Sequence, residues 1–288
     1  MELAMAETEG ERKWADLPCG PLSLIFEMIG TINIFLSAQL VCRQWWLLAQ
    51  ELYLYRRIMI LVECGRSGRW KESRRIIRRR SLEIALAAVD RSGGCLVEFG
   101  ILKYATDQLL ELITARSSSS LKILRLINCS LISGSVLVKT CGSLPLLEEI
   151  DISSTFVRSE VATSGIGRLC TKLKTFRSNA PNVHFWLANN RVALAIAKNM
   201  RGLRELELVG NRLNNYGLRA ILNRCTQLES LDIRGCHKAN FGRKLKKRYA
   251  MLKSVKAPRD STDDYPYELD ISMFYDDADC PIGRYDSS

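Results

Sequence analysis

Histidine is scarce in this chain, which has only His184 and His237 among 288 residues. Most catalytic nucleophiles need a neighbouring base, and most structural zinc sites combine histidine with closely spaced cysteines. Neither histidine lies in such a motif, although His237 directly follows Cys236, and no Gly-rich phosphate loop follows a predicted strand. We therefore predict a protein with no catalytic residues, no metal site and no cofactor of its own.

Paired cysteines and long apolar runs are also missing. The ten cysteines are scattered without a CxxC pair, so we expect reduced, buried thiols rather than a secreted disulfide framework. No uninterrupted apolar run approaches the roughly 18 residues of a membrane-spanning helix. Residues 1–13 lack the apolar segment of a secretory signal. These absences predict a nuclear and/or cytoplasmic protein with no membrane partner.

Charge is present but uneven. The chain carries +11 overall, whereas residues 259–288 hold two arginines and nine acidic residues, so this acidic tail is −7 and the rest +18. Eight basic residues crowd between positions 66 and 80 beside Trp70, which fits either a nucleic-acid contact or a solvated linker or helix face. A second basic run, RKLKKR, occupies residues 243–248.

Helical periodicity begins after a polar start. Residues 1–13 have no apolar period, which predicts a disordered N-terminus. Between residues 14 and 60, apolar side chains recur every three or four positions, which predicts short amphipathic helices. Pro21 suits the first turn of a helix that Gly30 ends, and a second stripe follows from Ile34. A module this small cannot bury so much apolar surface alone, so we expect a protein partner to cover it.

The same module carries an ordered motif. Leu17-Pro18, a helix, the run Val41-Cys42-Arg43-Gln44-Trp45 and the pair Tyr55-Arg56 follow one another at the spacing of an F-box, which the stretch resembles over its whole length. Two positions depart: Gly20-Pro21 stands where an acidic residue is usual, and Tyr55 replaces tryptophan. The resemblance implies a three-helix module that docks a Skp-type adaptor and, through it, cullin and RING subunits. Taken singly, each apolar residue fits core packing equally well. The residues assigned to adaptor binding are Leu17, Pro18, Leu22, Ile25, Ile29, Val41, Cys42 and Trp45.

A repeat dominates the rest of the chain. Residues 61–88 are assigned to a basic linker and helix, and residues 89–258 contain the frame L-x-x-L-x-L seven times at intervals of 24 to 30 residues. This is the period of leucine-rich repeats, in which the second and third apolar positions lie on one face of a short strand. A helical leg is expected after each strand. The frames begin at Leu96, Leu121, Leu147, Leu173, Leu203, Leu228 and Leu252.

A binding face follows from the repeat geometry. The residue between the two inward positions points to the opposite, concave side, which solenoids use for partners. The charges there have both signs, which suits a protein better than a polyanion, although each residue alone fits a solvated strand. The long fourth repeat adds Phe185 and Trp186, which we expect to be partly exposed. The predicted substrate-binding residues are Arg125, Asp151, Arg177, Glu207, Asp232, Lys256, Phe185 and Trp186.

The predicted fold is therefore an α+β multi-module chain: a small three-helix F-box followed by an α/β leucine-rich-repeat solenoid of about seven repeats and an acidic tail. We expect the aromatic residues 265–275 of that tail to dock back onto the positively charged array. The combination resembles plant F-box/leucine-rich-repeat proteins. It implies a non-catalytic substrate-recognition adaptor of an SCF-type E3 ubiquitin ligase, whose repeats bind an unknown protein substrate for ubiquitination and proteasomal degradation. The alternative is a nuclear repeat scaffold or nucleic-acid-associated protein that uses basic residues 66–80.

Overall fold

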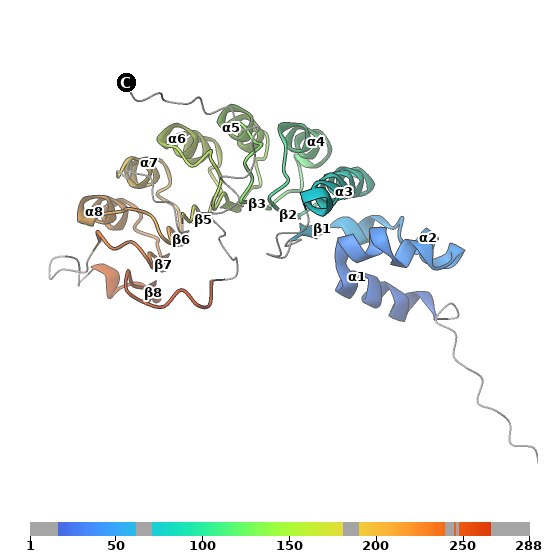
Figure 1. Cartoon of the computed structure of the whole chain (residues 1–288). Coiled ribbons are helices and arrows are strands. Elements are labelled where there is room, and N and C mark those ends of the chain that lie inside the picture. The colour runs from blue at the N-terminus through green and yellow to red at the C-terminus, as the bar shows by residue number, and fades with distance from the viewer. Residues whose placement is uncertain (1–16, 62–70, 181–189, 240–244, 246–247, 266–288) are drawn as a thin grey trace, which may run out of the picture.

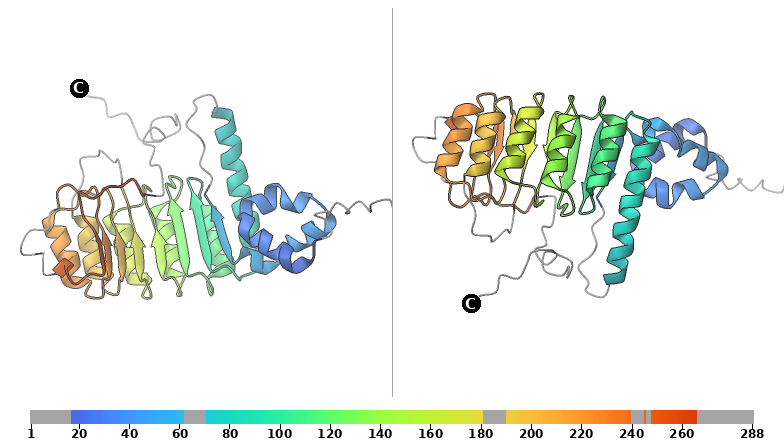
Figure 2. Two further views of the ribbon diagram at one scale, coloured as in Figure 1. Left: turned by 90° about the horizontal axis from the view of Figure 1, so that it is seen from below. Right: turned by 90° about the horizontal axis from the view of Figure 1, so that it is seen from above.

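The computed structural model describes residues 17–61, 71–180, 190–239, 245 and 248–265. One parallel sheet contains eight strands in chain order, each paired with the next in sequence (Figure 1). Helices α3 to α8 line the outer side of the resulting arc, and the strands line its inner side (Figure 1, Figure 2). The chain from β1 to β8 is therefore a leucine-rich-repeat solenoid with a concave strand face and a convex helical face.

The strands are short and the legs between them helical. The strands are β1 (Arg57–Ile60), β2 (Glu98–Leu102), β3 (Ile123–Ile127), β4 (Glu149–Asp151), β5 (Thr175–Arg177), β6 (Glu205–Glu207), β7 (Ser230–Asp232) and β8 (Ser254–Lys256). The helices of the solenoid are α3 (Lys71–Arg91), α4 (Asp107–Ser117), α5 (Gly134–Gly142), α6 (Glu160–Leu169), α7 (Arg191–Asn199) and α8 (Asn215–Arg224).

The predicted frame forms the core of this solenoid. In the first six frames all three frame positions are buried, as at Leu121, Leu124 and Leu126, which have no exposed surface. Ser178 takes the third position of one frame and is buried as well. Only the seventh frame, which begins at Leu252, is half-buried, because β8 is the last strand of the sheet among the described residues and has a neighbour on one side only.

Polar side chains fix where each repeat turns. Helices α4, α5, α6 and α8 each follow a residue whose side-chain oxygen accepts a hydrogen bond from the first turn, which stabilises a helix start. These capping residues are Thr106, Ser133, Ser159 and Asn214. At the turn that leaves the strand, Asn211 Nδ2 donates to the carbonyl of Ser178 at 2.8 Å, and the Cys236 thiol donates to that of Leu208 at 3.0 Å.

Most of the described cysteines lie in the core of the solenoid. All eight cysteines that the structure describes are free thiols, and five of them are buried. Burial raises the pKa of Cys129 and of Cys236 to about 12, so both thiols stay protonated at neutral pH. The predicted burial is confirmed for these five, which are Cys129, Cys141, Cys170, Cys225 and Cys236.

The N-terminal module contains α1 (Cys19–Leu36), α2 (Arg43–Leu48) and short 3-10 helices at Ala38–Leu40 and Leu52–Tyr55. Gly30 has φ 75° and ψ 169° and breaks α1 there, as predicted, because glycine tolerates the positive φ that other residues avoid. Phe26 is buried beneath the break and meets the Trp45 ring edge-on, with centroids 5.5 Å apart. The two halves of α1 and α2 thus share one small core.

The boundary between the modules differs from the sequence assignment. Strand β1 lies within the range assigned to the F-box, yet it pairs with β2 and opens the sheet, with Ile58 opposite Phe99. Helix α3 falls largely in the range assigned to a basic linker and helix, and it is the leg that follows β1. The sheet therefore has eight strands where the frame predicted about seven. Because RIMI lacks the leucine frame, only its pairing with β2 reveals the strand.

Arg91, at the end of α3, joins the two modules. Its guanidinium stacks on the Phe35 ring at 4.2 Å from the centroid. It also donates to Gln39 Oε1 at 3.1 Å and to the Tyr55 hydroxyl at 3.2 Å. A planar cation that stacks and donates at once fixes both neighbours, so α1 is held against the first repeat.

Helix α1 meets the length and composition of a membrane span, with a mean hydropathy of 1.6 over 18 residues. The sequence prediction considered uninterrupted apolar runs and overlooked this helix. Core helices of folded domains pass the same test, and α1 is broken at Gly30 and packs against α3 and β1. Length and composition alone are weak evidence for a span, so we describe α1 as a helix of the N-terminal module.

Candidate functional site

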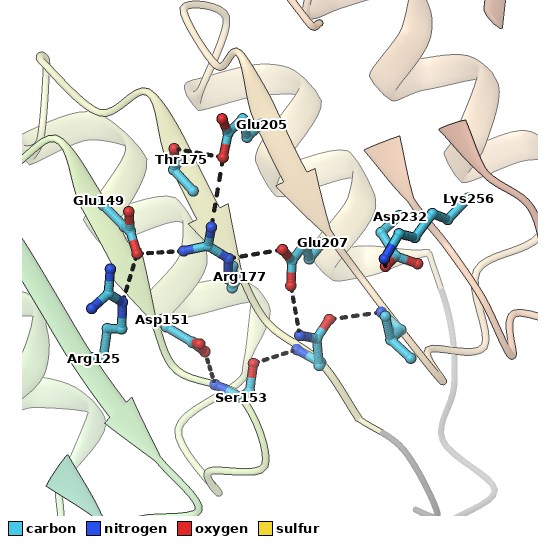
Figure 3. A network of polar contacts seen from close by, with 12 residues as sticks. Arg125, Glu149, Asp151, Ser153, Thr175, Arg177, Glu205, Glu207, Asp232 and Lys256 are labelled. Atoms are coloured by element: carbon cyan, nitrogen blue, oxygen red, sulfur yellow. Dashed lines mark hydrogen bonds and ion pairs between the residues drawn. The ribbon is translucent and has the colours of Figure 1, made fainter. Parts of the chain in front are cut away.

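A continuous row of side chains crosses the concave face. The strand register aligns the residues between the inward frame positions, so their predicted placement on one face is confirmed (Figure 3). Their role in substrate binding stays a prediction. The row runs from Gly100 through Arg125, Asp151, Arg177, Glu207 and Asp232 to Lys256.

Two arginines of this row are held by carboxylates of neighbouring strands. Arg125 lies between Glu98 and Glu149, with its Nε 2.7 Å from Glu149 Oε1. Arg177 pairs with the same Glu149 and with Glu207, its Nε 2.9 Å from Glu207 Oε1 (Figure 3). Burial alone would lower the pKa of each guanidinium, but the hydrogen bonds and charges of the carboxylates outweigh it and raise that pKa. The centre of the concave face is therefore a network in which each arginine is paired with carboxylates of neighbouring strands.

Asp151 is less available than predicted. It is 3% exposed, and its Oδ1 accepts a hydrogen bond from the Ser153 backbone N–H at 2.8 Å. Burial raises the pKa of Asp151 to about 6, although the hydrogen bonds from Ser153 and the charge of Arg177 oppose this shift. Asp232 is also buried. Both carboxylates lie on the predicted face, but each is committed to the protein's own turns rather than open to solvent.

The last repeats carry a second polar cluster. Arg234 is buried and binds Asp232 through its Nε and its Nη2, the latter 2.7 Å from Oδ2. Its remaining Nη1 donates to the Ser261 carbonyl at 2.7 Å and contacts the Asp264 carboxylate. Lys256 Nζ lies 2.8 Å from Asp264 Oδ2. The carboxylate of Asp264 thus bridges two cations, which lower its pKa to about 2, Lys256 most strongly.

Tyr265 follows directly and lies beside the loops that leave β4 and β5. Its side chain is half-buried, and Asn179 and Ser153 lie beside its hydroxyl. Burial raises the pKa of Tyr265, and the charge of Asp151 adds to that effect, so the hydroxyl stays protonated. A concave cavity of about 310 Å³ has Tyr265 in its wall together with Asp264 and the row from Arg125 to Lys256.

The first residues of the acidic tail contact the concave side of the array. Asp264 and Tyr265 line the cavity there, whereas residues 266–275, the rest of the segment predicted to dock, fall outside the described residues. Phe185 and Trp186 also fall outside them, so their predicted exposure stays a prediction. Sequence reasoning missed Arg234, although it stands two positions after Asp232 and side chains two apart share a strand face. The same rule would have found Asn179 after Arg177.

The residues predicted to bind an adaptor occupy the N-terminal module with unequal exposure. Pro18 and Val41 are exposed, whereas Leu17, Ile25, Ile29, Cys42 and Trp45 are half-buried. Leu22 has no exposed surface, so a direct contact with a partner is corrected to core packing. Leu22, Phe26 and Ile29 of this stripe belong to the module's own core, where Phe26 meets Trp45 of α2.

Sequence reasoning missed the apolar side chains beside that stripe. Leu24 is 63% and Met28 is 86% exposed, and their spacing of four places them on one face of α1. Large exposed apolar patches are uncommon on monomeric proteins and are typical of surfaces that bind other proteins. We call this set the apolar module surface. It consists of Leu24, Met28, Leu36, Leu40, Val41, Trp46, Leu47, Leu52 and Tyr53.

Two further features of the described residues bear on other functional classes. No group of three or more metal-ligating side chains occurs among the residues that the structure describes. The basic run 66–80 lies partly outside them, and at its described end Arg79 and Arg80 are exposed, with Arg79 Nε 2.9 Å from Glu83 Oε1.

Comparison with known proteins places the chain among plant relatives. It is 38% identical over 255 residues to F-box/LRR-repeat protein 23 of Arabidopsis thaliana, covering 88% of this chain and 55% of that protein. It is 36% identical to F-box protein SKIP19 of the same plant, covering 98% of this chain and 92% of that protein. F-box/LRR-repeat protein 22, also from Arabidopsis, is 34% identical, and the match covers 91% of this chain and 83% of that protein. The chain belongs to the plant F-box/LRR-repeat family.

The chain spans about half the length of the first of these relatives and nearly all of the second. No family model matches it. Among solved structures, a leucine-rich-repeat protein of Legionella pneumophila aligns with 52% of the chain at 14% identity and a TM-score of 0.37, a likeness too slight to carry an argument. Membership of the F-box/LRR-repeat family therefore rests on the sequence relatives and agrees with the solenoid described above.

Proposed function

We propose that this F-box/LRR-repeat protein is the non-catalytic substrate receptor of an SCF-type ubiquitin ligase. In this proposal the N-terminal module is a three-helix F-box, formed by the two halves of α1 and by α2, that docks a Skp-type adaptor. The solenoid holds a protein substrate in the nucleus or cytoplasm, so that other subunits transfer ubiquitin to it. Bringing two reactants together in a fixed geometry is itself a large contribution to rate.

The observation that carries the proposal is the apolar module surface. Nine large apolar side chains stand exposed between residues 24 and 53. Burying apolar area releases roughly 25 cal/mol for each Å², so a partner that covers several of these side chains gains affinity without needing charge complementarity. Tyr55, where the motif departs from the F-box pattern, leaves this surface intact, since it is buried and contacts Arg91. The second departure, Gly20-Pro21, is exposed in the first turn of α1.

The concave face supports the second half of the proposal. Its cations and carboxylates come from six successive strands and are fixed by one another, as Arg125 and Arg177 are by Glu149. A rigid pattern of both charges suits recognition of a folded or extended protein segment, because such patterns give specificity more than affinity.

Binding of purified full chain to a purified Skp-type adaptor tests the proposal. We would compare the native chain with Leu24→Ser/Met28→Ser, which removes two exposed apolar contacts from α1. The matched control is Val161→Ser/Met251→Ser, since Val161 is 79% and Met251 is 81% exposed on the solenoid. Titration calorimetry at 0.1 M and 0.5 M salt should give native and control affinities that agree within threefold, and at least a tenfold loss for the α1 variant. An apolar interface should be insensitive to salt.

A folded native chain that does not bind the adaptor would contradict the proposal, as would equal losses in both double variants. Nucleic-acid binding that weakens steeply with salt, in a chain that ignores the adaptor, would favour the alternative function through the basic run.

A further inference from the structure

The charge balance of the concave face changes along the sheet. In the centre, each arginine is paired with more than one strand carboxylate. Arg125, for example, contacts both Glu98 and Glu149. At the last two strands, Arg234 and Lys256 share a single strand carboxylate, that of Asp232, whose Oδ2 lies 2.7 Å from Arg234 Nη2 and 4.0 Å from Lys256 Nζ. The strands therefore leave one positive charge there without a partner of their own.

The chain's C-terminal segment supplies the missing charge. Asp264 contacts Arg234 and lies 2.8 Å from Lys256 Nζ, and the Ser261 carbonyl accepts a further hydrogen bond from Arg234 at 2.7 Å. Arg234 is held for this role, since Asp232 fixes the rest of its guanidinium and its side chain is only 4% exposed. A buried, oriented arginine with one donor directed outward is a preformed carboxylate site.

A second contact lies one residue away. Tyr265 reaches the loops that follow β4 and β5, where Asn179 and Ser153 lie beside its hydroxyl and Asn179 shares the cavity wall with it. The aromatic side chain therefore rests on the middle repeats while the acidic side chain of Asp264 rests on the last two. The two subsites together bind an acidic residue followed by tyrosine, here Asp264 and Tyr265, in a segment that lines the concave cavity.

We propose that this surface is a binding site for a partner protein segment in which aspartate or glutamate precedes tyrosine, and that residues 261–265 occupy it as an intramolecular competitor. The inference rests on the proposed function, because the partner would be the substrate that the solenoid holds. It adds a substrate class, an acidic–aromatic segment, and a condition for binding, displacement of the chain's own segment.

The short covalent connection between the solenoid and residues 261–265 determines how strongly these residues compete with a partner segment. Only five residues separate Pro258, whose carbonyl accepts a hydrogen bond from Gly235 N–H at 2.9 Å, from Asp264. A short tether presents its end at an effective concentration on the order of 1 mM. Suppose that a free segment binds the empty site with a dissociation constant of about 0.1 mM. Competition from the tethered residues 261–265 then weakens the apparent affinity of the free segment roughly tenfold.

Fluorescence anisotropy with a labelled peptide Ser-Thr-Asp-Asp-Tyr-Pro, the sequence of residues 261–266, tests this inference on the full chain. The variant Asp264→Asn/Tyr265→Ala empties both subsites in cis and should bind the peptide about tenfold more tightly than the native chain. Asp263→Asn is the matched control, because no ion pair of Asp263 occurs in the described structure, and it should bind like the native chain. Peptides with Asn-Asn for Asp-Asp, or Ala for Tyr, should bind at least fivefold more weakly to the emptied variant.

A third variant tests the site itself. Lys256→Gln, at a side chain that is 45% exposed, should cost the emptied variant at least fivefold in peptide affinity without unfolding it. If the segment is only a structural clasp, the emptied variant will melt at a lower temperature and bind the peptide no better than the native chain, which overturns the inference. Adaptor binding is measured on the same proteins. A chain that binds the adaptor but not the peptide rejects only this inference. A chain that binds the peptide but not the adaptor rejects the proposed ligase function.

Discussion

Replacing Asp151 with asparagine should stabilise the protein at neutral pH. Burial raises the pKa of Asp151 to about 6, from 3.8 in an unfolded chain. At pH 7 the carboxylate is charged in both states, so the folded state carries the cost of holding that charge in its interior. Each pKa unit corresponds to 1.36 kcal/mol, which gives on the order of 3 kcal/mol. Asparagine keeps an oxygen that can accept the bond from Ser153 N–H and removes the charge.

The sign of the pH dependence follows from the raised pKa. Between about pH 4 and pH 6 the folded state binds a proton at Asp151 that the unfolded state has lost, so native stability falls as pH rises through that window. Below pH 4 both states are protonated, and Asp151→Asn should match the native chain. Above pH 6 the difference should reach its full size, on the order of 3 kcal/mol.

Urea unfolding of both proteins at half-unit steps from pH 3.5 to pH 7.5 measures this difference, because all other titrating groups cancel in the comparison. Asp263→Asn, at an exposed position, controls for the loss of one negative charge from the chain. A difference that does not change with pH, or an asparagine variant that is less stable at pH 7, would refute the assignment of a buried, destabilising carboxylate at the turn after β4.

Two glycines give matched tests of the fold. Gly30→Ala should cost about 1–2 kcal/mol, because Gly30 has φ 75° and alanine disfavours that region, whereas Gly20→Ala in the first turn of α1, also with open space around it, should change thermal stability little. Gly165→Ala should cost about 1–3 kcal/mol, since its Cβ would lie 2.7 Å from Val138 Cγ1 between α5 and α6. Gly134→Ala, with no atom within 4 Å of the new Cβ, is its control, and equal melting temperatures for either pair would contradict this account of the packing.

The repeat and its binding face were predictable because they depend on spacing alone. The leucine frame fixes which residues enter the core, and a nearly constant period stacks equal positions on neighbouring strands. That is why Arg125, Asp151 and Arg177 fall into register on one face. Strand β1 was not predictable in this way, because Arg57–Ile60 has no frame and becomes a strand only by pairing with β2.

Exposure within the N-terminal module depends on packing that periodicity does not specify. The stripe that includes Leu22 resembles a partner contact and a core face equally well, and the position of α2 decides in favour of the core. Its neighbours Leu24 and Met28 are left outside for the same reason. Similarly, charge counting showed that the tail and the array attract, but only the positions of Arg234 and Lys256 determine which acid binds where.

The continuity of the two modules bears on how the proposed receptor works. Strand β1 follows directly from the 3-10 helix Leu52–Tyr55 and is the first strand of the sheet, so the N-terminal module is built onto the solenoid rather than tethered to it. Arg91 reinforces this junction by stacking on Phe35 and bonding to Tyr55. A flexible linker would let a bound substrate sample many positions relative to an adaptor on the apolar module surface. In the proposed receptor a fused junction would restrict those positions, so the choice of target lysine would depend on how the substrate sits on the concave face.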